Sequence, residues 1–223
     1  GGFSFGDAVA AGRIMASLMR ERLYPSLVRA VERGTPMIAP CNGFQIAVQM
    51  GLLPGPRPGE PWPERAPKPS VALAVNESGR FVDRWVGMEI PGETRCIWTR
   101  DLDLPEGTAL LPIAHGEGRF VVGDEDEHGG LMDRLAHDGQ IALRYGAGDN
   151  PNGSMGDVAG ICDASGLIFG LMPHPERYTR WTNHPWWTGL DEATRREHEP
   201  PGLQMFRNAV AFVRKQAELG AAM

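Results

Sequence analysis

Cys41 stands where a short apolar stretch meets a predicted helix, and this placement can present a nucleophile. Residues 37–39 are Met-Ile-Ala, and Asn42 and Gly43 follow the cysteine. In a sharp turn from strand to helix, the thiol lies at the carboxyl end of a sheet, and the first N–H groups of the helix point at the group that the sulfur attacks. The helix dipole also favours the thiolate. A single cysteine in an apolar stretch is more often a small core residue, so the catalytic interpretation needs a second motif.

A histidine and a glutamate near the far end of the chain supply that motif. His174 and Glu176 follow an apolar run at residues 167–172, which we predict to be a strand. Pro175 disfavours helix at His174, so we expect residues 174–176 to be extended, with alternate side chains on the same side. Glu176 can then fix the tautomer of the imidazole, while the other ring nitrogen takes the proton of Cys41. The tripeptide alone would more often be a surface histidine beside a solvated glutamate, but both motifs together indicate a Cys-His-Glu triad.

Three segments together resemble the class I glutamine amidotransferases, namely residues 1–7 (GGFSFGD), 41–45 (CNGFQ) and 173–177 (PHPER). Residues 76–85, 115–120 and 150–154 are similar, more narrowly, to the glutaminase subunits of phosphoribosylformylglycinamidine synthases in purine biosynthesis. The similarity covers most of the chain. One departure is Ala39-Pro40 before the cysteine, where the family commonly has glycine and an aliphatic residue. Pro40 donates no hydrogen bond, which suits the last residue of a strand, so we expect an intact site.

The resemblance implies a mechanism and a set of site residues. Cys41 would attack the side-chain amide of glutamine, His174 would pass its proton to the departing ammonia, and water would hydrolyse the thioester. The oxyanion would lie between the N–H of Asn42 and an N–H of the loop that holds Gly2 and Phe3. Contacts to glutamine are carried over to Gln45, Asn152, Gly153 and Ser154. The alternatives are an exposed polar residue of a helix for Gln45 and an ordinary turn for residues 152–154.

The resemblance also implies partners. The glycine-rich start lacks the Gly-Lys-Ser/Thr ending of a phosphate loop, so we expect no cofactor in this chain. ATP and magnesium would be used by a large synthetase subunit, which receives the ammonia and converts formylglycinamide ribonucleotide to formylglycinamidine ribonucleotide. A small accessory subunit would complete the complex. Two other interpretations stay open: an amidotransferase that serves a different synthetase, and a non-catalytic binding module of the same fold.

These functional residues require strands and helices in alternation. We predict helices at residues 7–32, 42–50 and 203–219, and the order of strand and helix around Cys41 is typical of a doubly wound sheet. Residues 163–166 (DASG) read as a hairpin turn. The expected fold is α/β, a doubly wound and mostly parallel sheet with flanking helices and extra antiparallel strands. The predicted strands are residues 36–39, 71–75, 81–90, 95–99, 108–114, 140–145, 157–162 and 167–172.

Composition bounds the remaining possibilities. The chain has 223 residues, 42% of them hydrophobic, which suits one domain over residues 1–223. Because the chain starts inside the Gly-Gly-Phe-Ser loop, we expect it to lack the first strand-helix-strand portion of the family's domain. The net charge of −6 argues against a nucleic-acid surface, and no apolar run is long enough for a membrane span. Three cysteines without metal-type spacing favour the reducing cytoplasm and no metal site.

Three further segments have weaker signals. Residues 54–69 are dense in proline and read as a surface loop rather than as a partner contact. Residues 115–119 (HGEGR) combine acid, base and glycine. We expect them to lie at the edge of a strand or to face the partner synthetase. Trp181, Trp186 and Trp187 are predicted to pack in the core, with a docking face as the alternative.

Overall fold

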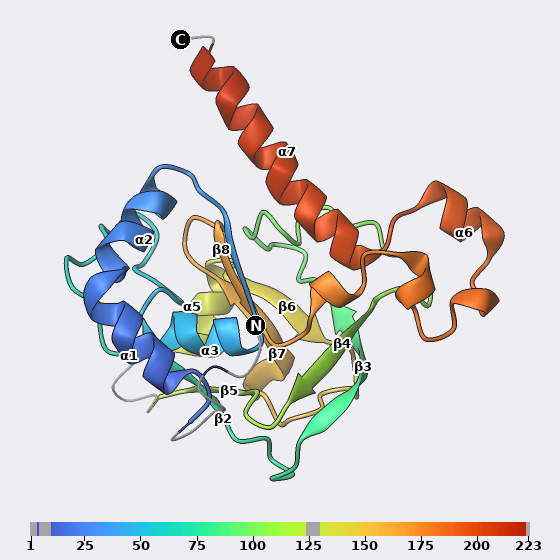
Figure 1. Ribbon diagram of the computed structural model, residues 1–223, viewed down its shortest axis with the longest axis horizontal. Helices are drawn as coiled ribbons and strands as arrows, with labels where there is room; N and C mark the ends of the chain where they lie inside the picture. Colours follow the sequence, from blue (N-terminus) through green and yellow to red (C-terminus); the bar gives the residue numbers. More distant parts are fainter. Residues whose placement is uncertain (1–3, 5–9, 124–129, 222–223) are drawn as a thin grey trace.

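The computed structural model describes residues 4, 10–123 and 130–221. Its centre is a six-stranded sheet with the strand order β1-β8-β7-β6-β3-β4 (Figure 1). A separate two-stranded sheet pairs β2 with β5. The strands are β1 (Met37–Pro40), β2 (Val71–Ala74), β3 (Val82–Glu89), β4 (Leu110–His115), β5 (Arg119–Val122), β6 (Ile141–Tyr145), β7 (Val158–Cys162) and β8 (Ile168–Leu171).

The sheet is mixed. β1 pairs in parallel with β8, whereas the other neighbouring strands of both sheets pair antiparallel. The predicted turn at residues 163–166 joins β7 to β8, and the N–H of Gly166 donates to the carbonyl of Asp163 at 2.9 Å. Such a short turn can join only antiparallel strands. Among the described strands, parallel pairing is therefore confined to β1 and β8, and the expected additional antiparallel strands make up more of the sheet than we predicted.

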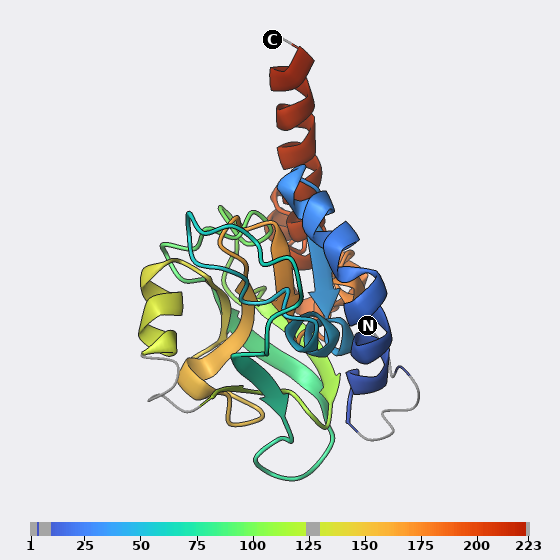
Figure 2. The ribbon, with the colours of Figure 1, turned by 90° about the vertical axis from the view of Figure 1, so that its left-hand side faces the viewer.

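Helices cover both faces of this sheet, as expected for the fold. Figure 2 shows α1 (Arg13–Arg22) and α2 (Tyr24–Glu32) on the side opposite α5 (Leu131–His137). The predicted helix at residues 7–32 is two helices over its described part, and residues 7–9 lie outside that part. The break follows from Pro25, which has no N–H for the preceding turn and restricts the backbone before it. α3 (Asn42–Gln49) confirms the helix predicted after Cys41.

The predicted strand at residues 95–99 is wrong. Residues 97–100 form turns, although Cys96, Ile97 and Trp98 are buried. The backbone makes isolated hydrogen bonds instead of a ladder, from the N–H of Arg95 to the carbonyl of Gly139 and from the N–H of Ile97 to the carbonyl of Gly166. The side chains of Arg95 and Trp98 bond to further carbonyls. The apolar run at residues 95–99 therefore indicates burial correctly, but these residues do not pair as a strand. The other predicted strands are confirmed to within a few residues, while β5, α5 and α6 (Glu192–Glu197) were not predicted.

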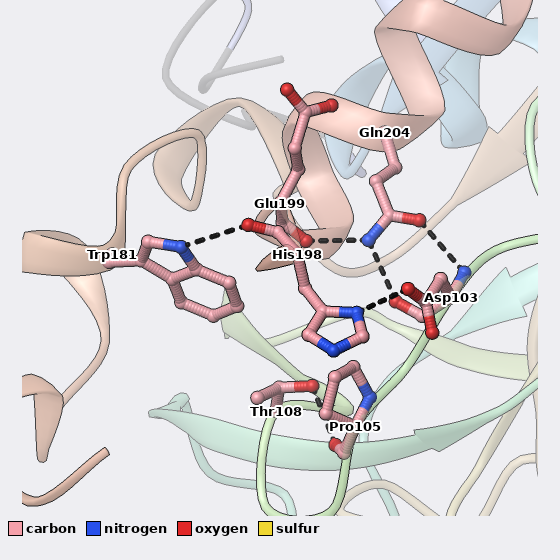
Figure 3. A network of polar contacts seen from close by, with 7 residues as sticks. All are labelled: Asp103, Pro105, Thr108, Trp181, His198, Glu199 and Gln204. Atoms are coloured by element: carbon pink, nitrogen blue, oxygen red, sulfur yellow. Dashed lines mark hydrogen bonds and ion pairs between the residues drawn. The ribbon is translucent and has the colours of Figure 1, made fainter. Parts of the chain in front are cut away.

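A polar network ties the last helix, α7 (Pro201–Ala221), to the body of the protein (Figure 3). The Gln204 amide donates to the carbonyls of Asp103 at 2.7 Å and Glu199 at 2.5 Å, and its oxygen accepts from the N–H of Asp103 at 2.8 Å. His198 pairs with the Asp103 carboxylate, and its carbonyl accepts from the indole of Trp181 at 3.3 Å. Beyond this anchor the helix projects outward, and residues 213–220 are exposed (Figures 1 and 2).

The two segments of unusual composition differ in their environment. Residues 54–69 contain neither helix nor strand, as predicted for a surface loop, and Trp62 packs against the core. Trp181 is partly buried and contacts Tyr178, whereas Trp186 is 68% exposed and Trp187 is 39% exposed. The core prediction therefore holds for Trp181 alone. In the part of the chain that the structure describes, no helix is long and apolar enough to cross a membrane.

Candidate active site

The backbone turns sharply at Cys41, between the end of β1 and the start of α3. Cys41 has φ 51° and ψ −110°, a conformation that a residue with a side chain rarely adopts. Its N–H donates to the carbonyl of Leu171 at 2.7 Å, and its carbonyl accepts from the N–H groups of Phe44 and Gln45 at 2.9 and 3.2 Å. The turn is thus fixed both to the end of β8 and to the first turn of α3, as expected for a nucleophile elbow.

Parallel pairing brings the two predicted motifs to one edge of the sheet. Pro40 at the end of β1 lies opposite Leu171 at the end of β8, so both chains leave the sheet on the same side. Three residues after the end of β8, the N–H of His174 donates to the carbonyl of Pro112 in β4 at 2.8 Å. The position of the histidine therefore depends on β4, the last strand in the order of the sheet, as well as on β8, which precedes it in the chain.

His174 and Glu176 contact each other, but not through the extended backbone that we predicted. Pro175–Arg177 form a 3-10 turn, in which the N–H of Tyr178 donates to the carbonyl of Pro175 at 3.0 Å. Pro175 suits the first position of such a turn because its N–H is not needed there. The turn still leaves Nδ1 of His174 2.6 Å from Oε1 of Glu176.

The charges at this site favour an imidazolium. Burial alone lowers the pKa of His174, but hydrogen bonds with Cys41 and Glu176 outweigh it and raise the pKa from 6.5 to about 9. For Glu176 burial acts in the opposite direction and raises the pKa. The hydrogen bond with His174 outweighs burial, so the pKa of Glu176 is below the ordinary 4.5. Since Glu176 occupies Nδ1, the Nε2 nitrogen of His174 is the one available to Cys41.

Asn42 and Gln45 are buried rather than exposed on the helix. The amide of Asn42 donates to Oε1 of Gln45 at 2.9 Å, and Nε2 of Gln45 donates to the carbonyl of Glu117 at 2.5 Å. Oδ1 of Asn42 accepts from the N–H of Ser4 at 3.4 Å. These side chains connect α3 to the loop of residues 115–118 and to the start of the chain. Gly2 and Phe3, the other predicted site residues here, lie outside the described residues.

Asn152, Gly153 and Ser154 form a turn whose polar groups bond within the protein. Oδ1 of Asn150 accepts from the N–H groups of all three residues at 3.0–3.3 Å. The Asn152 amide donates to the carbonyl of Gly118 at 2.9 Å and to the hydroxyl of Tyr145 at 3.2 Å. The turn is placed so that it supports the loop of residues 115–118. Contact of these residues with glutamine stays a prediction.

His115 and Asn76 also border the site, and we did not predict them as site residues. His115 is buried, and its Nδ1 lies 3.1 Å from Oδ1 of Asn76. Burial and, to a smaller extent, the charge of His174 lower the pKa of His115 to about 4. The sequence signal for a site residue here is the HGEGR segment at residues 115–119, which we interpreted only as a strand edge or a partner contact. Among the described residues, no group of three or more His, Cys, Asp or Glu residues could hold a metal ion.

Comparisons with known proteins agree with this geometry. A family model described as a CobB/CobQ-like glutamine amidotransferase domain matches residues 1–213. Phosphoribosylformylglycinamidine synthase subunit PurQ of Dehalococcoides mccartyi is 38% identical over 220 residues, which cover 96% of this chain and 78% of that protein. The same subunit of Archaeoglobus fulgidus is 37% identical over 225 residues, or 96% and 76% of the two chains. A chain in the solved structure of PurLQS from Thermotoga maritima is 30% identical with a TM-score of 0.64, over 96% of this chain and 77% of that one.

Proposed function

Because the chain belongs to the family of CobB/CobQ-like glutamine amidotransferase domains, we propose that it is the glutaminase subunit of a phosphoribosylformylglycinamidine synthase. The observation that carries the proposal is the placement of Cys41 beside His174 at the ends of the parallel pair β1 and β8, with Glu176 on the far side of the imidazole. PurQ relatives that are 37–38% identical over 96% of the chain support this particular synthase.

In the proposed reaction, the thiolate of Cys41 attacks the carboxamide carbon of glutamine and forms a tetrahedral intermediate. The N–H of Asn42 at the start of α3, together with an N–H from the loop of Gly2 and Phe3, stabilises the oxyanion. As the C–N bond breaks, His174 gives its proton to the departing nitrogen, which leaves as ammonia. Water, with His174 as the base, then hydrolyses the thioester to glutamate. Glu176 orients the imidazole and stabilises its protonated form.

The ammonia serves a second subunit. The solved relative is titled PurLQS, and the glutamine amidotransferase reaction alone needs no nucleotide. We assign ATP and magnesium to a large synthetase subunit, which uses the ammonia to convert formylglycinamide ribonucleotide to formylglycinamidine ribonucleotide. A small accessory subunit completes the proposed complex, which works in the cytoplasm. The names of the relatives disfavour a different synthetase, and the intact triad disfavours a non-catalytic module.

The alanine variant of Cys41 tests the proposal. In the complex with the synthetase, Cys41→Ala should abolish glutamine hydrolysis and glutamine-driven synthesis, because no thioester can form. Added ammonium salts should still support synthesis, since that step needs only the nitrogen nucleophile. Cys162→Ala is the matched control, because Cys162 is a buried thiol that lies opposite Phe169, away from the end of β8 at Leu171. Full glutamine-driven activity of folded Cys41→Ala would refute the proposal.

A further inference from the structure

The hydrogen bonds around Asn76 determine which nitrogen of His115 carries its proton. The amide nitrogen of Asn76 donates to the carbonyls of Arg80 at 2.8 Å and His115 at 2.9 Å, and both partners can only accept. Oδ1 of Asn76 is therefore the atom that faces the imidazole. Because this oxygen can only accept, Nδ1 of His115 must be the donor across the 3.1 Å contact.

The opposite nitrogen, Nε2, is then an unprotonated acceptor. His115 is 2% exposed, and Nε2 has no hydrogen-bond partner among the described residues. Buried polar atoms in folded proteins nearly always have a partner, so this lone pair calls for a ligand. The backbone of Gly118 also packs closely against the ring and holds it in place. A Cβ added at Gly118 would lie 2.4 Å from Cε1 and Nδ1 of His115, so no larger residue fits there.

The strand that ends at His115 and the loop after it contact the groups that would carry out the reaction. The carbonyl of the preceding residue, Ala114, is 3.7 Å from Sγ of Cys41, and the carbonyl of Pro112 in the same strand accepts from His174. The loop that follows His115 accepts the hydrogen bond from Gln45. Burial and, to a smaller extent, the charge of His174 lower the pKa of His115 to about 4, so the ring is neutral at physiological pH.

We propose that Nε2 of His115 accepts a hydrogen bond from the carboxamide nitrogen of bound glutamine and from the ammonia that this nitrogen becomes. This role rests on the proposed glutaminase function. The nitrogen receives one proton from His174, so it gains one N–H bond as the C–N bond breaks, and it therefore needs an acceptor and not a second acid. His115 forms and breaks no covalent bond. The product glutamate has no N–H on its γ-carboxylate, so the same lone pair disfavours the product.

Two substitutions separate this role from a purely structural one. In His115→Asn, the new amide nitrogen can replace Nδ1 and keep the bond to Asn76, but nothing occupies the position of Nε2. In His115→Gln, the longer side chain can bring a carboxamide oxygen to that position. We expect kcat for glutamine hydrolysis in the synthetase complex to fall about tenfold in His115→Asn, the size of one hydrogen bond, and to fall less in His115→Gln. His137→Asn, at an exposed histidine of α5, is the matched control.

The opposite order of activities, with His115→Asn close to wild type and His115→Gln impaired, would show that the ring only supports the loop. Equal and unchanged rates in both variants would also overturn the proposal. A wild-type complex that hydrolysed no glutamine would instead overturn the glutaminase function itself.

A second measurement keeps His115 intact. In Cys41→Ala protein labelled with nitrogen-15 histidine, glutamine should move the Nε2 resonance of His115 in the direction of hydrogen-bond acceptance. Glutamate, which offers no γ N–H, should leave that resonance in place. A resonance that glutamine at saturation does not move would overturn the assignment, whatever the variants show.

Discussion

Replacing Glu176 with glutamine should slow glutamine hydrolysis by roughly five- to tenfold and should destabilise the protein more at about pH 6 than at about pH 10. The carboxylate lies 2.6 Å from Nδ1 of His174, and a glutamine amide can still accept a hydrogen bond there. The substitution therefore removes the charge and keeps the orientation. The effect should be milder than that of His174→Ala, which removes the base itself.

The expected size follows from the pKa of His174. Its rise from 6.5 to about 9 occurs although burial opposes it, and Cys41 and Glu176 share the effect. At about 1.4 kcal/mol for each pKa unit, the two partners together favour the imidazolium by about 3 kcal/mol or more. The side chain of Glu176 is 44% exposed, so water screens its charge. We therefore assign Glu176 about 1 kcal/mol, the upper range for exposed ion pairs.

The sign of the pH dependence is fixed by both groups. The folded-state pKa of His174 is raised, so its contribution to stability is complete below 6.5 and is lost as the pH rises through about 9. Burial raises the pKa of Glu176 but the hydrogen bond with His174 outweighs it, so the net pKa is below 4.5. The contribution of Glu176 is therefore present above 4.5 and is lost in acid. The pair stabilises the protein most between these limits, from pH 4.5 to 6.5.

Thermal unfolding at about pH 6 and about pH 10 tests this reasoning. At the lower pH, Glu176→Gln should reduce Tm by about 2–4 °C, the shift that 1 kcal/mol gives in a chain of this size. At the higher pH the two proteins should unfold together. Glu192→Gln is the control, because it removes a carboxylate whose side chain is 73% exposed and whose partner is Arg196. Equal Tm losses at both pH values would mean that Glu176 acts through shape and not through charge.

Two further predictions follow from the described geometry. A glutamine-mimicking electrophile should label Cys41 much faster than Cys96 or Cys162, because only Cys41 lies at a helix start beside a histidine; mass spectrometry that found equal labelling of all three would refute the elbow. Gly170→Ala should cost about 1–3 kcal/mol in the free energy of unfolding, since its Cβ would lie 2.2 Å from the ring of Phe44 in α3, and unchanged denaturant unfolding would contradict this packing.

The sequence was sufficient for the parts of the site that local signals encode. An apolar run, a cysteine and small residues predicted the elbow at Cys41, and a strand followed by His-Pro-Glu predicted the contact between His174 and Glu176. The conformation of residues 175–177 was not predictable in the same way, because proline is compatible both with extended chain and with the first position of a 3-10 turn.

The failures arose where long-range packing decides the structure. Residues 95–99 have the composition of a strand, but their backbone bonds go singly to Gly139 and Gly166, which only the tertiary fold brings near. The role that we propose for His115 could not be predicted for a similar reason. Its tautomer depends on Asn76, which is 39 residues away in the chain. No local sequence pattern predicts the contact between His115 and Asn76.

The antiparallel half of the sheet is part of the proposed active site. β1 and β8 bring Cys41 and His174 to one edge, but neither strand supplies the polar groups that face these residues from the other side. β4 does so, with the carbonyl of Pro112 bonded to His174, the carbonyl of Ala114 near the thiol, and His115 at its end. β4 reaches this position only because β3 pairs both with β4 and with β6. A substitution that loosens β3 should therefore impair glutamine hydrolysis even though no residue of that strand belongs to the triad.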